Sequence, residues 1–254
     1  MGESKAKIKA NLPRRLTQVR VGSCYLNLPW LTRSVTACRV LARRNLGFYY
    51  GVMENTLNII YLRGQAIAPY IDDLAQLRIT VFREFPYLYD GTPEYEARYL
   101  QTYLNSVDSI AVLALDGLKV VGASTGLPLA HEEMDFQKPF LDQGYDPQTL
   151  FYGGESVLLP AYRGQGIYKT FFAGREKHAQ ELGGFTHLTF CGVQRPADHA
   201  LRPANYVPLD AIWRKFGYES QPALQTTYTW KDIDQPESTA KPMLFWMKAL
   251  GTSV

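Results

Sequence analysis

A short glycine loop between an apolar strand and a helix constrains the fold of this chain more than any other segment. The chain passes from Glu155 through Leu159 and Pro160 to the loop Arg163-Gly164-Gln165-Gly166. Glycines at 164 and 166 let the backbone approach a ligand closely, with consecutive N–H groups pointing outward. The helix behind adds its free N-terminal donors, and Arg163 adds a charge suited to phosphate oxygens. The segment therefore predicts a pyrophosphate site.

Two other phosphate-binding loops do not fit this segment. No Gly-Lys-Ser/Thr follows, so it is not a Walker loop, and the third glycine of a dinucleotide fingerprint is missing. A surface turn with incidental glycines would account for Gly-x-Gly alone. The added Arg163, the preceding Pro160 and the strand and helix on either side favour a ligand site.

The order of predicted elements indicates an α/β (mixed α+β) fold with helices on both faces of a mixed, mostly antiparallel sheet. Asp116-Gly117 marks a hairpin, Pro86 is expected to stop the first helix, and Gly183-Gly184 to end the helix after the loop. Strands are expected at 57–62, 109–115, 119–127, 150–159, 187–191, 218–230 and 242–249, and helices at 65–85, 94–105, 165–182 and 209–216.

The charge of the chain is unevenly distributed. Residues 1–52 carry ten Lys and Arg against one acid, whereas residues 53–254 carry 17 bases and 23 acids. The mildly acidic body gives no reason to expect a nucleic acid partner. No apolar run is long enough to span a membrane, and the three widely spaced cysteines argue against a disulfide framework. These features favour a cytoplasmic protein.

The basic segment 1–52 has three interpretations. Its Arg-rich, acid-poor composition fits an organellar transit peptide, it could be an arm that binds an anionic surface, or it could be an over-extended start before Met53. Each interpretation predicts a poorly ordered segment outside a single domain at 53–254. A transit peptide would place the protein in an organelle.

The glycine loop resembles the acetyl-CoA signature of the GNAT N-acetyltransferase superfamily, Gln/Arg-x-x-Gly-x-Gly/Ala. Arg163 and Gly166 stand at its fixed positions, and Leu158–Gly164 resembles the apolar-x-Pro-x-x-Arg-Gly lead-in. Downstream, Ile212–Tyr218 is similar to the family's late helix ending in Gly-Phe or Gly-Tyr. The element order matches over about residues 57–249, nearly the whole body of the chain.

The resemblance implies a fold, a cosubstrate and a set of binding residues. Acetyl-CoA would be held at its pyrophosphate by the loop and helix start, and main-chain groups of two leucines would pair with the pantetheine arm and polarise the thioester carbonyl. The strand of Leu158 would splay from that of Phe190 to admit the acyl group. The cofactor-binding residues are thus Leu158, Leu159, Arg163, Gly164, Gln165, Gly166, Ile167 and Tyr168.

Two positions depart from the family pattern. Tyr168 stands where the final Gly or Ala is usual, and Trp213 stands where many members have a tyrosine that protonates the leaving thiolate. An indole cannot give up a proton at neutral pH. Tyr206 and Tyr218 are the candidate acids instead, and direct attack with proton return through water needs no side-chain acid.

An amine must lose a proton before it attacks a thioester, and Glu155 is the first candidate base. An apolar setting beside Val157 and Leu159 would raise its pKa, although it could also be an ordinary strand carboxylate. Cys191 is expected to be an inert core thiol. Asp198-His199 and His131-Glu132-Glu133 are expected to be surface or loop features without a metal. The acidic insertion at 128–149 is either a lid that selects cations or a solvated loop.

The sequence predicts an N-acyltransferase that transfers an acetyl or short acyl group from acyl-CoA to an amine of a small molecule or peptide, in a ternary complex. The alternative is a non-catalytic acyl-CoA-binding or interaction module on the same fold, which the substitution at Trp213 keeps open. Nucleic-acid binding through residues 1–52 is a third interpretation. A monomer and a homodimer are both compatible with the sequence.

Overall fold

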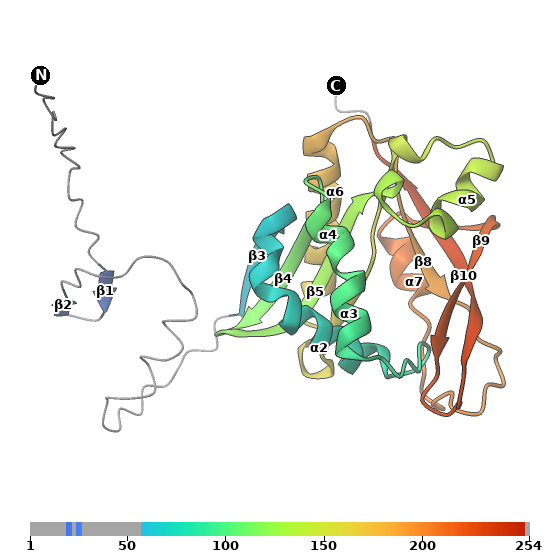
Figure 1. Ribbon diagram of the computed structural model, residues 1–254, viewed down its shortest axis with the longest axis horizontal. Helices are drawn as coiled ribbons and strands as arrows, with labels where there is room; N and C mark the ends of the chain where they lie inside the picture. Colours follow the sequence, from blue (N-terminus) through green and yellow to red (C-terminus); the bar gives the residue numbers. More distant parts are fainter. Residues whose placement is uncertain (1–18, 22–23, 27–56, 252–254) are drawn as a thin grey trace, which may run out of the picture. The chain divides into compact units, whose positions relative to one another are not determined.

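The computed structural model describes residues 19–21, 24–26 and 57–251. The chain divides into two units, Met1–Met53 and Glu54–Val254. Within the first, β1 (Val19–Val21) pairs antiparallel with β2 (Cys24–Leu26). The expected disorder of 1–52 otherwise falls outside the described residues. The second unit holds every other described helix and strand (Figure 1).

The second unit is built on an eight-stranded mixed sheet, most of whose strands are antiparallel. Its strand order is β3-β4-β5-β6-β8-β10-β9, with β7 also paired to β5, and only β6 and β8 run parallel. The strands are β3 (Leu57–Arg63), β4 (Ile110–Asp116), β5 (Lys119–Pro128), β6 (Leu150–Tyr152), β7 (Ser156–Leu158), β8 (His187–Val193), β9 (Glu219–Lys231) and β10 (Ser238–Ala249). The predicted fold class is confirmed.

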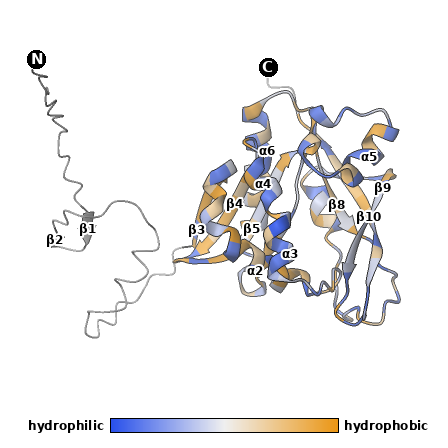
Figure 2. Cartoon of the chain, in the orientation of Figure 1, coloured by the Kyte–Doolittle hydropathy of each residue, from blue (hydrophilic) through white to orange (hydrophobic). Residues whose placement is uncertain are grey.

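Successive side chains of β4 are buried on opposite faces of the sheet. Ala111 and Leu113 pack into one hydrophobic cluster with residues of the first helix, whereas Ile110 and Val112 pack into a second cluster with the helix after the glycine loop. A strand directs successive side chains to opposite faces, so helices cover the sheet on both sides. Figure 2 shows the mainly hydrophobic colour of β4 between these helices.

The first helical segment is shorter than predicted. A 3-10 turn, η1 (Gly64–Tyr70), contains Pro69 and precedes α2 (Ile71–Phe82). The predicted second helix is two helices, α3 (Pro93–Tyr99) and α4 (Gln101–Asn105), joined at Leu100. The helix after the glycine loop, α6 (Ile167–Leu182), and the short α7 (Asp210–Lys215) lie within two residues of their predicted bounds.

The acidic insertion at 128–149 is folded rather than loop-like. It forms the 3-10 turn η2 (Leu129–His131), the helix α5 (Met134–Asp142) and the 3-10 turn η3 (Pro147–Thr149). Phe136 and Phe140 of α5 are buried in the same cluster as α2. The apolar residues between the acids thus give the segment its own hydrophobic face.

The predicted strand 150–159 is broken into β6 and β7 by Gly153-Gly154-Glu155. A Cβ on Gly154 would lie 1.7 Å from the hydroxyl of Tyr103, so the chain can pass this buried tyrosine only as glycine. The break ends the pairing with β8 and keeps that with β5: β6 pairs with both β5 and β8, whereas β7 pairs with β5.

Candidate functional site

The sheet opens between β7 and β8. The N–H of Gly153 donates to the carbonyl of Thr189 at 2.7 Å, and no backbone pairing between these two segments follows it in the described part of the chain. Leu159 donates its N–H to Val121, so its backbone faces β5. Backbone groups alternate in direction along a strand, so those of Leu158 face the opening. The strands of Leu158 and Phe190 therefore diverge, as the resemblance implies.

The glycine loop lies at the end of this opening, between β7 and α6. A 3-10 turn, η4 (Pro160–Tyr162), leads into it, and Gly164 and Gly166 have φ of 78° and 82°. These left-handed values favour glycine at both positions. Gly166 is the residue that caps α6, so the loop ends on the axis of a sixteen-residue helix.

The backbone N–H groups of residues 164–168 form a row of free donors. Among the described residues none of these five amides reaches a backbone or side-chain acceptor, and the first bonds of the helix come from Lys169 and Thr170 to the carbonyl of Gly166. Free N–H groups at a helix N-terminus, together with the positive end of the helix dipole, form an anion site.

Arg163 braces the loop and stays accessible. Its Nε donates to the carbonyl of Leu158 at 3.2 Å, and its terminal nitrogen Nη2 pairs with Glu84 at 2.9 Å. The side chain is 48% exposed. A hollow of about 290 Å³ borders the loop at Tyr162 and Gln165. The loop thus carries a half-exposed arginine, whose charge is shared with Glu84, beside an open hollow.

On the other face of the sheet, a cavity of about 80 Å³ lies where β6, the glycine break and β8 meet. Tyr152, Gly154 and Cys191 form its floor. Its walls are mainly aromatic, and we call it the aromatic cavity; its wall residues include Tyr87, Tyr89, Tyr95, Tyr99, Tyr228 and Trp230. The hydroxyls of Tyr95 and Tyr228 are 2.5 Å apart and join α3 to β9.

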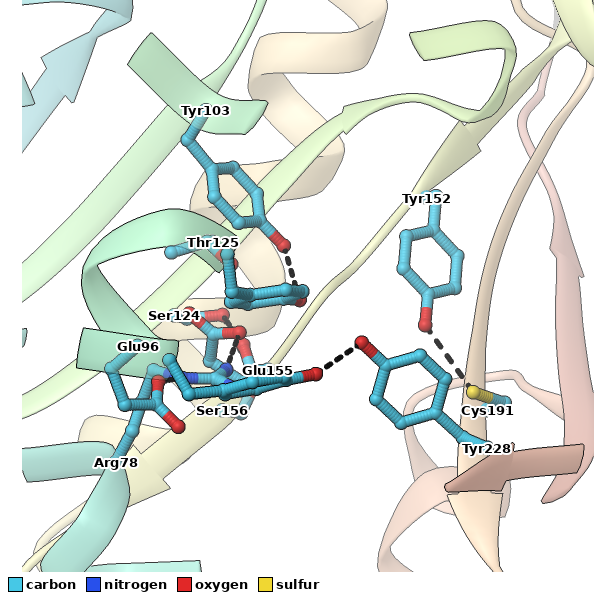
Figure 3. Close-up of polar contacts among 12 residues, drawn as sticks. Arg78, Glu96, Tyr103, Ser124, Thr125, Tyr152, Glu155, Ser156, Cys191 and Tyr228 are labelled. Atoms are coloured by element: carbon cyan, nitrogen blue, oxygen red, sulfur yellow. Dashed lines mark hydrogen bonds and ion pairs between the residues drawn. The ribbon is translucent and has the colours of Figure 1, made fainter. Parts of the chain in front are cut away.

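Arg78 of α2 lines the cavity and holds two buried carboxylates. It pairs with Glu96 at 2.5 Å and with Glu155 (Figure 3). Its guanidinium lies 4.2 Å from the centre of the Tyr99 ring. Both carboxylate side chains are fully buried, and each keeps one oxygen without a partner among the described residues. Burial raises the pKa of Glu155, and the charge of Arg78 opposes this rise.

Glu132 adds a third buried carboxyl that the sequence did not indicate. It was expected to be a loop residue, but it is 6% exposed and its Oε1 has no hydrogen-bond partner within the described ranges. Burial raises the pKa of Glu132 to about 7, and the charges of Glu155 and Glu133 add to the rise. No local pattern distinguishes Glu132 from the acids around it, because its burial depends on how the whole insertion packs.

The two tyrosines predicted as acids lie in different surroundings. Tyr218 is 3% exposed, within 5.4 Å of the ring centre of Phe172, and burial raises its pKa. Tyr206 is half-buried, with its ring edge against Phe85 at 4.7 Å, and burial raises its pKa as well. Neither borders the aromatic cavity.

Trp213 and Tyr168, the two departures from the family pattern, are hydrogen-bonded to each other. The indole Nε1 of Trp213 donates to the hydroxyl of Tyr168 at 3.2 Å. Burial raises the pKa of Tyr168 and the bond from Trp213 lowers it. The ring of Tyr168 packs on Phe172, one turn further along α6. The side chain of Tyr168 therefore packs against its own helix and is hydrogen-bonded to α7.

Cys191 and the two acid–histidine motifs form no nucleophilic or metal site in the described part of the chain. Cys191 is buried, its Sγ lies 3.2 Å from the hydroxyl of Tyr152, and burial raises its pKa to about 12. The Nδ1 of His199 accepts from the N–H of Leu201, and that of His131 bonds to Ser106. Within the described residues, no group of three His, Cys, Asp or Glu could hold a metal ion.

Comparison with known proteins supports the fold. No protein-family model matches the sequence, and no curated protein matches it. Among solved structures, NAA60 of Arabidopsis thaliana in complex with a bisubstrate analogue has a TM-score of 0.51 at 14% identity, covering 77% of this chain and 100% of that one. A proposed acetyltransferase of Salmonella typhimurium, solved with its cofactor acetyl-CoA, has a TM-score of 0.50 at 8% identity and covers 78% and 96%.

A third match agrees with these two. A proposed acetyltransferase of Acinetobacter baylyi has a TM-score of 0.50 at 12% identity and covers 78% of this chain and 95% of that one. The body of the chain therefore has the GNAT acetyltransferase fold, as the loop and element order predicted. No helix in the described ranges is both long and apolar enough to cross a membrane.

Proposed function

We propose that the protein is an acyl-CoA-dependent N-acyltransferase that transfers an acetyl or short acyl group to an amine. The observation that carries the proposal is the row of free amides at residues 164–168, behind two left-handed glycines and beside an open sheet. Fold neighbours that include a structure with acetyl-CoA support the choice of cosubstrate.

The free amides would hold the pyrophosphate of CoA, and Arg163 would add charge. Five N–H donors at a helix start can meet several phosphate oxygens without moving, because no internal bond must first break. Leu158 would direct its backbone to the pantetheine arm. The N–H of Leu159 already bonds to Val121, so its part would be to shape the wall of the opening.

Glu155 is the proposed base, coupled to Glu132. Burial raises the pKa of both carboxyls, and the charge of Glu155 adds to the rise at Glu132, so a proton that the amine releases could be held in this group. Arg78 fixes one oxygen of Glu155 and leaves the other free. A base with a raised pKa suits this task, because it accepts a proton near neutral pH.

For protonation of the leaving thiolate, Tyr206 and Tyr218 remain candidates, and the structure adds Tyr168. Trp213 cannot give up a proton, but its indole orients the phenol of Tyr168. Removal of the correct hydroxyl by Tyr→Phe should lower the rate by roughly 100- to 10,000-fold and leave CoA affinity unchanged. A rate unaffected by all three changes would assign the proton to water.

The decisive experiment measures CoA binding with two glycine variants matched in local conformation. Gly166 and Gly144 have φ of 82° and 80°, and a Cβ added at either position would have no other atom within 4 Å. Both Gly→Ala changes therefore cost similar stability, but only Gly166→Ala distorts the anion loop. We expect Gly166→Ala to weaken CoA binding in calorimetry at least roughly tenfold, about 1.4 kcal/mol, with Gly144→Ala unchanged.

A charge reversal provides a second test. Arg163→Glu should also weaken CoA binding at least roughly tenfold, because it removes a phosphate contact and repels the anion. Arg63→Glu is the matched control, since Arg63 is similarly exposed and pairs with Glu181. If purified protein bound no CoA, or if Arg163→Glu bound it as tightly, the proposed function would be wrong.

A second candidate function is a non-catalytic acyl-CoA-binding module, favoured by Trp213 at the usual position of the acid. The two functions differ in thiol release. An enzyme releases free CoA from acetyl-CoA in proportion to an added amine, whereas a binding module is stabilised by CoA and releases none with any amine in a panel.

A further inference from the structure

Arg175 is a buried arginine without a carboxylate partner. It lies on the face of α6 that packs against the sheet, and only 3% of the residue is exposed. Arg78, the other buried arginine in the described ranges, pairs with two carboxylates, whereas no ion pair of the described residues involves Arg175. A buried guanidinium that lacks a counter-charge is costly, so this position needs an explanation.

Most of the hydrogen-bond donors of Arg175 are free. Its Nη1 donates to the carbonyl of Glu155 at 3.2 Å and to that of Thr125 at 3.5 Å. Nε and Nη2 have no acceptor among the described residues, which leaves three of the five N–H donors of the guanidinium unused. Neither nitrogen belongs to the fully enclosed polar atoms that lack a partner, so both reach accessible space.

The guanidinium lies where the sheet begins to open. A Cβ added to Gly153 would be 2.6 Å from Nη1 and 2.9 Å from Cζ of Arg175, so the guanidinium occupies the space that a side chain there would fill. Gly153 makes the last backbone bond to β8 before the strands diverge. On the other side, the guanidinium lies 4.4 Å from the ring centre of Phe172, whose ring packs on Phe190 of β8. Arg175 therefore stands at the closed end of the opening, among aromatic rings.

This end of the opening is within reach of a ligand held at the glycine loop. Arg175 follows Gly166, the cap of α6, by nine residues. At about 1.5 Å per residue the two positions are roughly 14 Å apart along the helix. The pantetheine arm of CoA is long enough to cover this distance. A pyrophosphate on the free amides would thus bring the acyl end of the molecule to the level of Arg175.

The carboxylates near Arg175 are engaged elsewhere. Glu176, its neighbour in α6, pairs with Lys248 at 2.7 Å. The carboxylate of Glu155 is turned toward α2 and is held by Arg78. Burial raises the pKa of Glu155, and the charge of Arg78 opposes this rise more strongly than that of Arg175. Arg175 thus contacts the backbone of Glu155 but has no acidic side chain to accept its free donors.

We propose that the transferred acyl group carries a carboxylate at its far end, so that the donor is the CoA thioester of a dicarboxylic acid, and that Arg175 selects it. This proposal rests on the proposed function and narrows its acyl donor to one class. Nε and Nη2 would donate two parallel hydrogen bonds to the carboxylate, a geometry that arginine favours. The methyl group of an acetyl would leave these donors unmatched.

The carboxylate would take no part in the transfer itself. The nitrogen of the acceptor amine forms an amide bond with the thioester carbon, and the bond from that carbon to sulfur breaks. CoA leaves as a thiol with the proton that the amine releases. The product is an amide that still carries the distal carboxylate, so a neutral or cationic acceptor would gain a negative charge.

The test is calorimetry of the full chain with thioether analogues that cannot be hydrolysed. S-(2-carboxyethyl)-CoA and S-(3-carboxypropyl)-CoA are each compared with the corresponding primary amide, which has the same number of non-hydrogen atoms and no charge. Free CoA is titrated in parallel and reports on the glycine loop alone. The two chain lengths cover the dicarboxylic acyl groups that are small enough to stay beside the sheet opening.

Two variants and one control separate recognition by Arg175 from general damage. Arg175→Gln removes the charge and keeps an amide donor for the carbonyl of Glu155. Gly153→Ala keeps every charge and displaces the guanidinium, since the three atoms nearest to a Cβ at this position all belong to Arg175. Arg63→Gln is the control, because Arg63 is an exposed arginine at the end of the edge strand β3.

We expect at least one of the two acids to bind at least roughly tenfold more tightly than its amide, the ratio for a charge-assisted over a neutral hydrogen bond. Arg175→Gln should reduce this ratio to about twofold or less, and Gly153→Ala should reduce it at least roughly threefold. Arg63→Gln should leave it unchanged, and all three variants should bind free CoA as the wild type does, within about twofold.

Equal binding of acid and amide by the wild-type protein, or a preference that stays unchanged in both Arg175→Gln and Gly153→Ala, would overturn the proposal. If free CoA still bound in that case, only the choice of acyl group would be wrong and the proposed function would stand. If free CoA did not bind to the wild-type protein, both would be overturned.

Discussion

Glu132 should make the stability of this protein fall as the pH rises from 5 to 8, and Glu132→Gln should abolish that loss. The carboxyl is 6% exposed, and burial raises its pKa from 4.5 to about 7. The folded protein therefore holds a proton on Glu132 over a range in which the unfolded chain releases it. The stabilisation is fully present below pH 4.5 and is lost as the pH rises through about 7.

The size of the effect follows from the two pKa values. Integrated from pH 5 to pH 8, the difference in proton binding is worth about 2 to 3 kcal/mol of unfolding free energy for this single group. Glutamine has the shape of the protonated acid and does not titrate. We therefore expect the wild-type protein to be less stable than Glu132→Gln by about 2 to 3 kcal/mol more at pH 8 than at pH 5.

Urea denaturation of the two proteins at pH 5, 6, 7 and 8 measures this difference directly. Contributions of the other titrating groups to the unfolding free energy are common to both proteins and cancel in the difference. Glu237→Gln is the matched control, because this glutamate is exposed and its charge is not among those that shift the pKa of Glu132. Its curve should stay parallel to the wild type. If the Glu132→Gln curve also stayed parallel to the wild type from pH 5 to pH 8, the carboxyl would be ionised at low cost and the reasoning would be refuted.

Three further predictions concern residues that line the aromatic cavity or pack against its lining. Gly154→Ala should destabilise the protein by about 1–3 kcal/mol in urea denaturation, and a second change, Tyr103→Phe, should recover part of this loss. A full loss that Tyr103→Phe does not reduce would locate the strain elsewhere. Arg195→Ala should cost about 3 kcal/mol, because buried Asp232 loses its bidentate partner and keeps only Lys241, whose Nζ lies 3.4 Å away. A change below about 1 kcal/mol would contradict this. In a protein whose only cysteine is Cys191, a thiol reagent at pH 8 should react only after unfolding, because the pKa of about 12 keeps the thiol protonated. Rapid labelling of the native protein would show an accessible thiolate.

The glycine loop could be predicted from sequence because all of its parts are adjacent in the chain. Gly164 and Gly166, the arginine before them and the helix behind lie within a few residues, and each has a local conformational role. The same holds for the hairpin between β4 and β5, and for Gly183 and Gly184, whose φ of 75° and 80° end α6. Local signals determine these features without reference to the rest of the fold.

The aromatic cavity could not be predicted, because its walls come from segments far apart in sequence. Tyr89 and Tyr228 approach the same space through the pairing of strands and the packing of α3. Among seventeen tyrosines, nothing local marks those that line a cavity. The one available signal was the pair Gly153-Gly154 within an apolar run. The predicted strand 150–159 runs through these two glycines, although adjacent glycines in a strand indicate a bulge or a close backbone approach.

The strand break links the two halves of the site physically. Because Gly154 has no side chain, the chain can pass the hydroxyl of Tyr103 and leave the ladder with β8, which opens the sheet beside the anion loop. The same break turns Glu155 toward α2, where Arg78 and Glu96 meet it at the wall of the aromatic cavity. One local irregularity thus opens the path for a thioester on one side and assembles buried carboxylates on the other. A substitution that straightened the strand should therefore impair CoA binding and the buried ion pairs of Arg78 together, whereas Gly166→Ala should affect CoA binding alone.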